Sequence, residues 1–223
     1  MLSRLRLRHF RNYSSLDMDF NAGLNLITGL NGQGKTNILE AVQYLSILRS
    51  FRTRKTNDLR QWGSSFFFVE GSLATRADET GPWKISISYA EGRRLRVDGQ
   101  VVNKAADFIG RVRCIACVPE DIMIVKGGPA ERRRFIDMLL CQYSRQYLGD
   151  LVNYKMALKS RNRMLKEPAK YDSHAFAAYD NLLVRYGASV ICARQKFIFL
   201  FADLLAAEGT ELFGGKSEVL LQY

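Results

Sequence analysis

A glycine-rich stretch, GLNGQGKTN, runs from Gly29 to Asn37 between an apolar run and a helical pattern. Glycines at its first and sixth positions, followed by Lys35 and Thr36, match the phosphate-loop template G-x-x-x-x-G-K-[ST]. In such a loop the backbone N–H groups point at phosphates, and the helix that follows presents its positive end. Lys35 can reach the β- and γ-phosphates, and the Thr36 hydroxyl can bind Mg²⁺. A chance glycine-rich turn is the alternative, but the strand, loop and helix pattern favours a nucleotide site.

Other candidates for metal or catalytic chemistry are weaker. Cys114 and Cys117 have C-x-x-C spacing, but no second pair or histidine completes a zinc set. Their apolar run predicts a place in the core instead. His9 and His174 are the only histidines, and the sequence suggests no catalytic partner for either.

A surplus of basic residues indicates a polyanionic partner. The chain has 33 Lys and Arg against 22 Asp and Glu, a formal net charge of +11. Such a surplus favours nucleic acid through phosphate contacts and counterion release, although a solubilising surface has the same composition. The candidates for contact with DNA phosphates are Arg49, Arg52, Arg54, Lys55, Arg132, Arg133 and Arg134. Arg4, Arg6 and Arg8 are weaker candidates, and a solvated face is the alternative for every cluster.

Composition excludes several classes of protein. The chain has 223 residues and is 47% hydrophobic, enough for one large domain or two small ones. No run approaches the roughly 20 apolar residues of a membrane span. The N-terminus lacks the apolar centre of a signal peptide, and four cysteines make no disulfide framework. We therefore expect a cytoplasmic protein without a membrane partner.

The first half of the chain has hydrophobic patterns that are typical of β-strands. Alternation of apolar and charged residues predicts strands in RLRLRHF and LDMDF, and GLNLIT predicts a short central strand. Further strands are predicted in FFFVEGSL, WKISISY and VRCIACV. The run RRLRVDGQVV contains Asp98-Gly99 between two extended stretches and predicts a hairpin. A helix is predicted directly after the phosphate loop, in NILEAVQYLSIL.

From about Pro119 onward, the apolar residues have the spacing of α-helices. Pro129 can begin a helix, and a second helical pattern follows in LVNYKMALKSRNRMLK and stops before Pro168. A third pattern covers residues 174–207, with an interruption at Gly187. The predicted domains are therefore residues 1–120, with the phosphate loop, and residues 121–223, mainly helical.

Four sequence blocks stand out in order along the chain: LRHFRNY, the stretch from Gly29 to Thr53, the stretch from Val118 to Asp137, and LKSRNRMLK. Together they resemble the bacterial RecF family. The resemblance implies an α/β fold: an ABC-type ATPase head, related to SMC heads, with a mixed sheet in its first lobe and a mainly helical second lobe. It also implies binding of ATP and Mg²⁺, and an ATP-dependent homodimer on double-stranded or gapped DNA. The family helps to load recombinase at single-strand gaps with the RecO and RecR proteins.

The resemblance also assigns residues. The family's nucleotide-binding positions correspond to Gly29, Leu30, Asn31, Gly32, Gln33, Gly34, Lys35, Thr36 and Asn37, with Thr36 as the Mg²⁺ ligand. Arg11 and Asn12 match an N-terminal motif that lies near the nucleotide in SMC-like heads. Val118–Ile122 match the family's Pro-Glu-Asp segment, near the junction of the lobes.

One departure from the family affects the expected chemistry. The ABC signature motif and the Walker B carboxylates of the family are absent from these 223 residues, so the catalytic residues are unknown and the chain resembles an N-terminal portion. Phosphoryl transfer needs groups that stabilise the γ-phosphate and orient water. We therefore expect this portion to bind ATP without turnover, and the full-length protein to be a slow, DNA-stimulated ATPase. A structural SMC-like head and a small-molecule P-loop kinase are the alternative readings.

Overall fold

The structure is a computed structural model that describes residues 1–74, 83–214 and 221. It divides into two compact units. The first comprises Met1–Arg132 and Cys141–Arg145, and the second comprises Arg133–Leu140 and Gln146–Tyr223. The division runs through one helix, α4, which spans Pro129–Tyr143.

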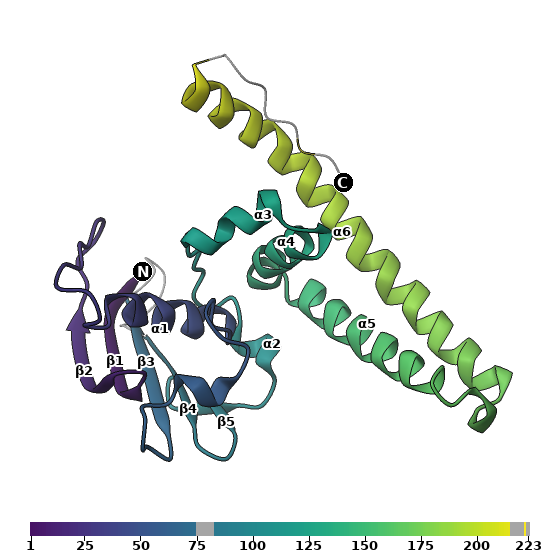
Figure 1. Ribbon diagram of the computed structural model, residues 1–223, viewed down its shortest axis with the longest axis horizontal. Helices are drawn as coiled ribbons and strands as arrows, with labels where there is room; N and C mark the ends of the chain where they lie inside the picture. Colours follow the sequence, from purple (N-terminus) through teal and green to yellow (C-terminus); the bar gives the residue numbers. More distant parts are fainter. Residues whose placement is uncertain (75–82, 215–220, 222–223) are drawn as a thin grey trace. The chain divides into compact units, whose positions relative to one another are not determined.

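An antiparallel sheet forms the centre of the first unit (Figure 1). The strand order is β2-β1-β3-β4-β5-β6, and every strand pairing in the described part of the chain is antiparallel. The strands are β1 (Leu2–Phe10), β2 (Tyr13–Asp19), β3 (Phe67–Leu73), β4 (Trp83–Tyr89), β5 (Arg93–Val97) and β6 (Gln100–Val102).

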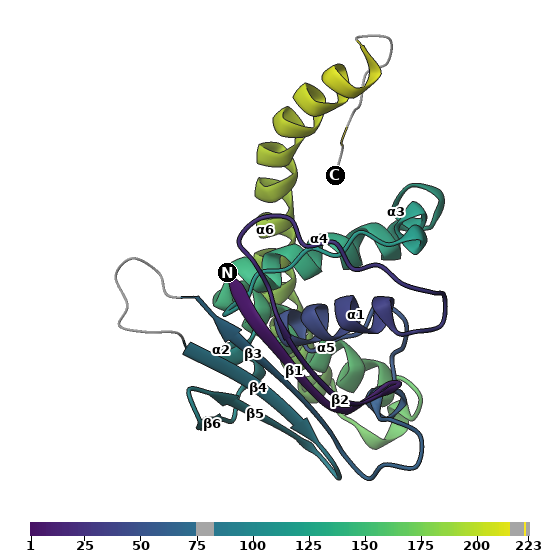
Figure 2. The ribbon, with the colours of Figure 1, turned by 90° about the vertical axis from the view of Figure 1, so that its left-hand side faces the viewer.

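Alternating side chains give this sheet one apolar face, which helix α1 (Lys35–Ile47) covers (Figures 1 and 2). Leu5 and Leu7 of β1 point into the core and are fully buried. Phe67 of β3 lies at its centre, with its ring 5.6 Å from that of Phe10 and 5.8 Å from that of Tyr44 in α1. Burying one such aromatic side chain contributes about 1.5–3 kcal/mol. The predicted strands β1, β3 and β4 and the predicted helix α1 are therefore confirmed.

The opposite face of the sheet is polar, and two of its arginines, Arg4 and Arg6, are paired with carboxylates. The Arg4 guanidinium donates to both carboxylate oxygens of Asp17, at 2.6 and 2.7 Å. Arg6 donates to Asp17 at 3.1 Å and to Glu70 at 3.4 Å. The hydrogen bond from Arg4, with the charges of Arg4 and Arg6, lowers the pKa of Asp17 to about 2. These contacts pair the charges of Arg4 and Arg6 across neighbouring strands, which favours the solvated-face alternative for them.

The hairpin predicted around Asp98-Gly99 is confirmed. Strands β5 and β6 pair in register, with Val97 opposite Gln100. Asp98 has φ 48° and Gly99 has φ 77°. Positive φ at both central residues is the conformation of a type I′ turn, whose twist fits the flanking strands.

Two predicted strands do not form among the described residues. Residues 23–28 and 112–118 have extended or irregular backbone without a paired neighbour. Leu24 is 94% exposed, Leu26 is 83% exposed and Ile115 is 71% exposed. An apolar run becomes a strand only where another strand satisfies its N–H and C=O groups. The prediction that Cys117 lies in the core is wrong for the same reason, since its side chain is exposed.

Short helical turns complete the first unit. They are η1 (Thr56–Leu59), α2 (Ala105–Phe108), η2 (Pro119–Ile122) and α3 (Met123–Lys126). Phe108 of α2 is fully buried in the same core as the sheet. Ser46 of α1 donates at 2.7 Å to the side chain of Gln142 near the end of α4, which ties this part of α4 to the first unit.

The second unit consists of helices, as the sequence predicted. Helix α5 spans Arg145–Met164, a short turn η3 spans Pro168–Lys170, and α6 spans Ser173–Phe213. Helices α5 and α6 lie side by side (Figure 1), with Ser189 of α6 donating to Asp150 of α5 at 2.6 Å. Among the described residues no helix is both long and apolar enough to cross a bilayer.

Gly187 does not interrupt α6, contrary to the prediction. The helix continues through it, and a Cβ atom there would lie 3.3 Å from the ring of Tyr154 on α5. A glycine in a helix interior costs about 1 kcal/mol relative to alanine. Here the missing side chain makes room for Tyr154, so the glycine is explained by close packing of two helices.

Candidate nucleotide-binding site

The phosphate loop lies between the extended residues 24–28 and the first turn of α1, on the surface of the first unit. Gly34, the N-cap residue of α1, has φ 99°, a conformation that L side chains rarely adopt. A Cβ atom at Gly34 would also lie 2.6 Å from Oδ1 of Asn12 and 2.9 Å from the hydroxyl of Tyr13. The glycine is therefore required both by the turn and by the approach of the β1–β2 connection.

Lys35 bridges its own loop. Its ammonium donates to the carbonyls of Gly29 at 2.7 Å and Leu30 at 2.8 Å. This places a cation at the end of the loop where Gly29 begins, in front of the helix N-terminus, and both charges favour a bound anion. Thr36 follows in the first helical turn with an exposed side chain. One hydroxyl fits the way Mg²⁺ is usually held, by few protein ligands together with phosphate oxygens and water.

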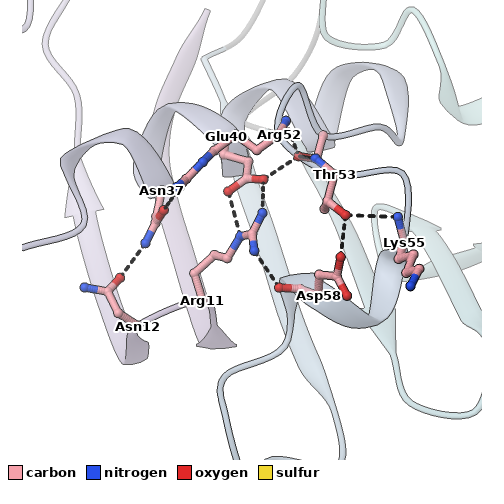
Figure 3. Close-up of polar contacts among 9 residues, drawn as sticks. Arg11, Asn12, Asn37, Glu40, Arg52, Thr53, Lys55 and Asp58 are labelled. Atoms are coloured by element: carbon pink, nitrogen blue, oxygen red, sulfur yellow. Dashed lines mark hydrogen bonds and ion pairs between the residues drawn. The ribbon is translucent and has the colours of Figure 1, made fainter. Parts of the chain in front are cut away.

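Asn12 links the phosphate loop to α1, and Figure 3 shows its contact with Asn37 of that helix. Its side-chain amide donates to the carbonyl of Gln33 at 3.1 Å. Its Oδ1 accepts a hydrogen bond from Asn37 at 2.8 Å, and Oδ1 of Asn37 accepts from Arg52 at 2.9 Å. A continuous polar chain therefore runs from a carbonyl of the phosphate loop, through Asn12 and Asn37, to Arg52.

A second polar chain starts at Arg11, whose guanidinium lies on Glu40 of α1 (Figure 3). Two hydrogen bonds, of 2.8 and 2.6 Å, join the guanidinium to the Glu40 carboxylate, which is fully buried. A third nitrogen of Arg11 donates to the carbonyl of Asp58 at 2.7 Å. The Ser50 hydroxyl donates to Glu40 and accepts from the backbone N–H of Arg52 at 2.9 Å. Arg11 thus contacts α1 and the residues after it, rather than the loop.

Sequence reasoning missed Glu40, Ser50 and Asp58. Glu40 stands four residues before the buried Tyr44, on the core-facing side of α1. A carboxylate on a buried helix face is rarely tolerated without a charged partner. This position was the signal in the sequence that could have revealed the Arg11 pair.

The residues from Arg49 to Lys55, called the basic segment below, follow α1 and carry four exposed basic side chains. Arg52 is held by Asn37, as described above. Arg49, Arg54 and Lys55 form no ion pair with any residue that the structure describes. The first polar chain therefore links the basic segment to the phosphate loop through Arg52, and the second holds its Ser50 on Glu40 of α1.

The remaining candidates lie further along the chain. Arg132, Arg133 and Arg134 are exposed in the first turns of α4. Arg132 donates to the carbonyl of Gly127 at 3.0 Å. The Val118–Ile122 segment forms η2, where the carboxylate of Asp121 accepts from the N–H of Val118 at 2.8 Å. The Asp121 side chain therefore closes a local turn.

The amino-acid sequence matches a known protein family and several curated proteins. Residues 4–172 match the family described as an AAA domain. The chain is 38% identical over 222 residues to the DNA replication and repair protein RecF of Streptococcus suis, covering all of this chain and 60% of that protein. It is 39% identical over 198 residues to RecF of Lactococcus lactis subsp. cremoris, covering 88% of this chain and 55% of that protein. The chain thus spans about 60% of the length of its curated relative from Streptococcus.

The solved structures that resemble this chain are also RecF proteins. The recombination mediator protein RecF with ATP, described as part of the RecFOR pathway, superposes with a TM-score of 0.88 at 30% identity. It covers 94% of this chain, which corresponds to 57% of that one. A second RecF structure, with ATPrS, has the same TM-score. These likenesses confirm the predicted fold class, an α/β nucleotide-binding head with a mainly helical second part.

Proposed function

This chain belongs to the RecF family of AAA-domain proteins, and from that premise we propose that it is the ATP-binding part of a DNA replication and repair protein. The phosphate loop would hold the triphosphate, and the Thr36 hydroxyl would be a ligand of the Mg²⁺ that neutralises part of the phosphate charge. The full-length protein pairs with a second copy on double-stranded or gapped DNA when ATP is bound. With the RecO and RecR proteins it helps to load recombinase at single-strand gaps in the cytoplasm.

The observation that carries this proposal is the conformation of the phosphate loop. Gly34 has the left-handed backbone that lets α1 begin directly after the loop. Lys35 lies across the loop, 2.7 Å from the Gly29 carbonyl, where a phosphate oxygen could replace the carbonyl as its partner. The cation, the helix N-terminus and the loop N–H groups all favour a polyphosphate.

DNA contact is proposed for the basic segment. Arg49, Arg54 and Lys55 have exposed side chains, and cations of this kind contact phosphates without reading bases. The segment is joined to the phosphate loop through Arg52, Asn37 and Asn12. This link supports an ATP-dependent DNA-binding switch, because a change in the loop carbonyls on nucleotide binding reaches the segment through hydrogen bonds.

The test is ATP binding by Lys35→Ala and Thr36→Ala in the full-length protein. The first removes a charge from the phosphates and the second removes the Mg²⁺ ligand. Hydrogen bonds to charged groups contribute about 1.5–3 kcal/mol each, so ATP·Mg affinity measured by calorimetry should fall at least about tenfold in either variant. Lys84→Ala, an exposed lysine on β4, is the matched control and should bind as the wild type does. Unchanged affinity in both loop variants would remove the basis of the proposal.

A further inference from the structure

Trp62 is unusually exposed for its residue type. Its relative exposure is 100%, whereas the large aromatic residues Phe10, Phe67 and Phe108 of the same unit are fully buried. Tryptophan normally contributes to stability by burying its large apolar ring, and a protein gains nothing from holding it in water. Tryptophan is enriched at binding interfaces, where its ring has one apolar side and one side in water.

The exposure is built into the fold, because the backbone on both sides of Trp62 is anchored. Gln61 donates its N–H to the carbonyl of His9 at 2.7 Å, and its side chain bonds to the His9 ring at 2.9 Å. Arg60 forms a bridge with Phe10 at the end of β1. Gly63 then turns the chain with φ 80°, and Ser64 donates back to Gln61 at 3.1 Å. The indole is therefore presented from a fixed turn.

Trp62 shares an open pocket with residues that contact the phosphate loop. The pocket has a volume of about 550 Å³ and is lined by Arg11, Asn12, Asn37, Arg52, Asp58, Arg60, Gln61 and Trp62. Asn12 is the residue that bonds to the carbonyl of Gln33 in the loop. One wall of the pocket is thus attached to the nucleotide site, and Trp62 lines the same pocket.

The direction of the loop decides which part of a nucleotide would enter this pocket. Lys35 reaches the carbonyls of Gly29 and Leu30, and this lysine contacts the β- and γ-phosphates in phosphate loops. The terminal phosphates therefore belong at the Gly29 end. The α-phosphate and the nucleoside belong at the Gln33 end, where Asn12 and the pocket lie.

We propose that Trp62 is the stacking platform for the nucleobase of the nucleotide whose phosphates lie on residues 29–36. The inference rests on the proposed function, since it requires a nucleotide on that loop. The ligand chemistry is a planar nucleobase, held by its π-face against the indole. Every base has such a face, so the platform should serve adenine and guanine nucleotides alike and add affinity rather than strong base selectivity.

The test compares ATP with inorganic tripolyphosphate, which has the phosphates but no base, using calorimetry on the full-length protein with Mg²⁺. Trp62→Ala should weaken ATP and GTP by about tenfold or more and leave tripolyphosphate affinity unchanged. Trp62→Phe, which keeps an aromatic face, should retain most of the ATP affinity. Lys35→Ala should weaken ATP and tripolyphosphate together. Tyr143→Ala removes another exposed aromatic side chain of the first unit and should change neither.

Indole fluorescence separates the two sources of a base. ATP should quench the emission of the wild-type protein while tripolyphosphate does not, and Trp62→Phe, which retains Trp83, should abolish the quenching. A single-stranded oligonucleotide added without ATP should not quench it. Quenching by the oligonucleotide but not by ATP would overturn the assignment in favour of a DNA base. Equal ATP affinity in Trp62→Ala and wild type, with Lys35→Ala impaired, would overturn it while the nucleotide site stands. Unimpaired ATP and tripolyphosphate binding in Lys35→Ala would instead remove the nucleotide site itself.

Discussion

The Arg11–Glu40 pair places a carboxylate inside the core of the first unit, where Glu40 has 0% exposure. A buried charge is tolerated only when its partners replace the lost water. Arg11 supplies two hydrogen bonds, of 2.8 and 2.6 Å, and the Ser50 hydroxyl supplies another. Arg11 itself has φ 53°, in the left-handed region. The turn between β1 and β2 is therefore shaped to deliver this guanidinium to α1.

Removing one partner of the pair should be more harmful than removing both. Arg11→Ala leaves Glu40 buried and uncompensated, and such changes cost about 3–5 kcal/mol. The double variant Arg11→Ala, Glu40→Gln should be closer to wild type, because a neutral amide costs less to bury. Trp62 and Trp83 both lie in the first unit, so urea unfolding followed by their fluorescence reports on that unit.

Arg11→Lys is the matched control for this cycle. It keeps the positive charge but loses the two-pronged geometry of the guanidinium, so its stability should fall between wild type and Arg11→Ala. An Arg11→Ala protein within about 0.5 kcal/mol of wild type, the range of ordinary surface changes, would contradict the structural role of the pair.

At the scale of elements, the β1–β2 pairing is held by ion pairs on the outer face of the sheet. Arg4 stands opposite Asp19 in the register and reaches diagonally to Asp17. The same carboxylate also accepts from Arg6. Because both arginines belong to β1 and the carboxylate to β2, titration of Asp17 reports directly on whether the two strands are paired.

This ion pair predicts a pH dependence with a definite sign. The pKa of Asp17 is lowered from 3.8 to about 2 by the hydrogen bond and charge of Arg4 and by Arg6. A lowered carboxyl pKa stabilises the folded state at pH above 3.8, and the contribution is lost as the pH falls toward 2. NMR titration of the Asp17 side-chain carboxyl should therefore show a midpoint near 2. Arg4→Ala should raise this midpoint, and Arg6→Ala should raise it less. A midpoint near 3.8 in the wild type would show that the pair does not form in solution.

Local patterns explain which elements could be predicted from the sequence. The alternation in β1 and the Asp98-Gly99 turn are decided by neighbouring residues, so these predictions are confirmed. Residues 23–28 and 112–118 have the composition of strands, but a strand also needs a neighbour, which composition does not supply. Glycine alone predicts a break in α6 at Gly187. The sequence does not show that the glycine makes room for Tyr154, because that contact depends on a second helix.

The candidate site also contains residues that could be predicted from the sequence and residues that could not. The phosphate loop was predictable because its glycines, lysine and threonine are contiguous. The partners of Glu40 were not, because Arg11, Ser50 and Asp58 meet it through the fold of separate segments. Nor was the exposure of Trp62, which depends on the bridge between Phe10 and Arg60.

At the scale of the whole chain, part of the positive charge behind the net +11 can be assigned to a particular surface. Arg4 and Arg6 are paired on the sheet, whereas Arg49, Arg54 and Lys55 are exposed and form no ion pair within the described residues. The anchors of this basic segment are Ser50 and Arg52, which contact Glu40 and Asn37. The exposed cations can therefore be removed without disturbing the contacts that hold the segment in place.

Replacing Arg49, Arg54 and Lys55 by alanine should reduce DNA binding by the full-length protein and flatten its salt dependence. Each lost phosphate contact lowers the slope of log affinity against log salt concentration by about 0.9 on duplex DNA. The measurement is fluorescence anisotropy with a labelled duplex in the presence of ATP, over a series of salt concentrations. Duplexes of unrelated sequence should bind with similar affinity, because phosphate contacts carry no sequence information.

The triple variant Lys84→Ala, Lys104→Ala, Lys126→Ala removes the same charge from three exposed lysines outside the basic segment. It separates a local contact from a general effect of net charge, because it should keep a slope closer to wild type. ATP affinity should be nearly unchanged in both triple variants, since neither alters a residue of the phosphate loop or its polar chains. A wild-type slope in the Arg49, Arg54, Lys55 variant would place the DNA surface elsewhere, with Arg132, Arg133 and Arg134 the next residues to replace. Strong discrimination between unrelated duplexes would instead show that base contacts, and not the phosphates, dominate recognition.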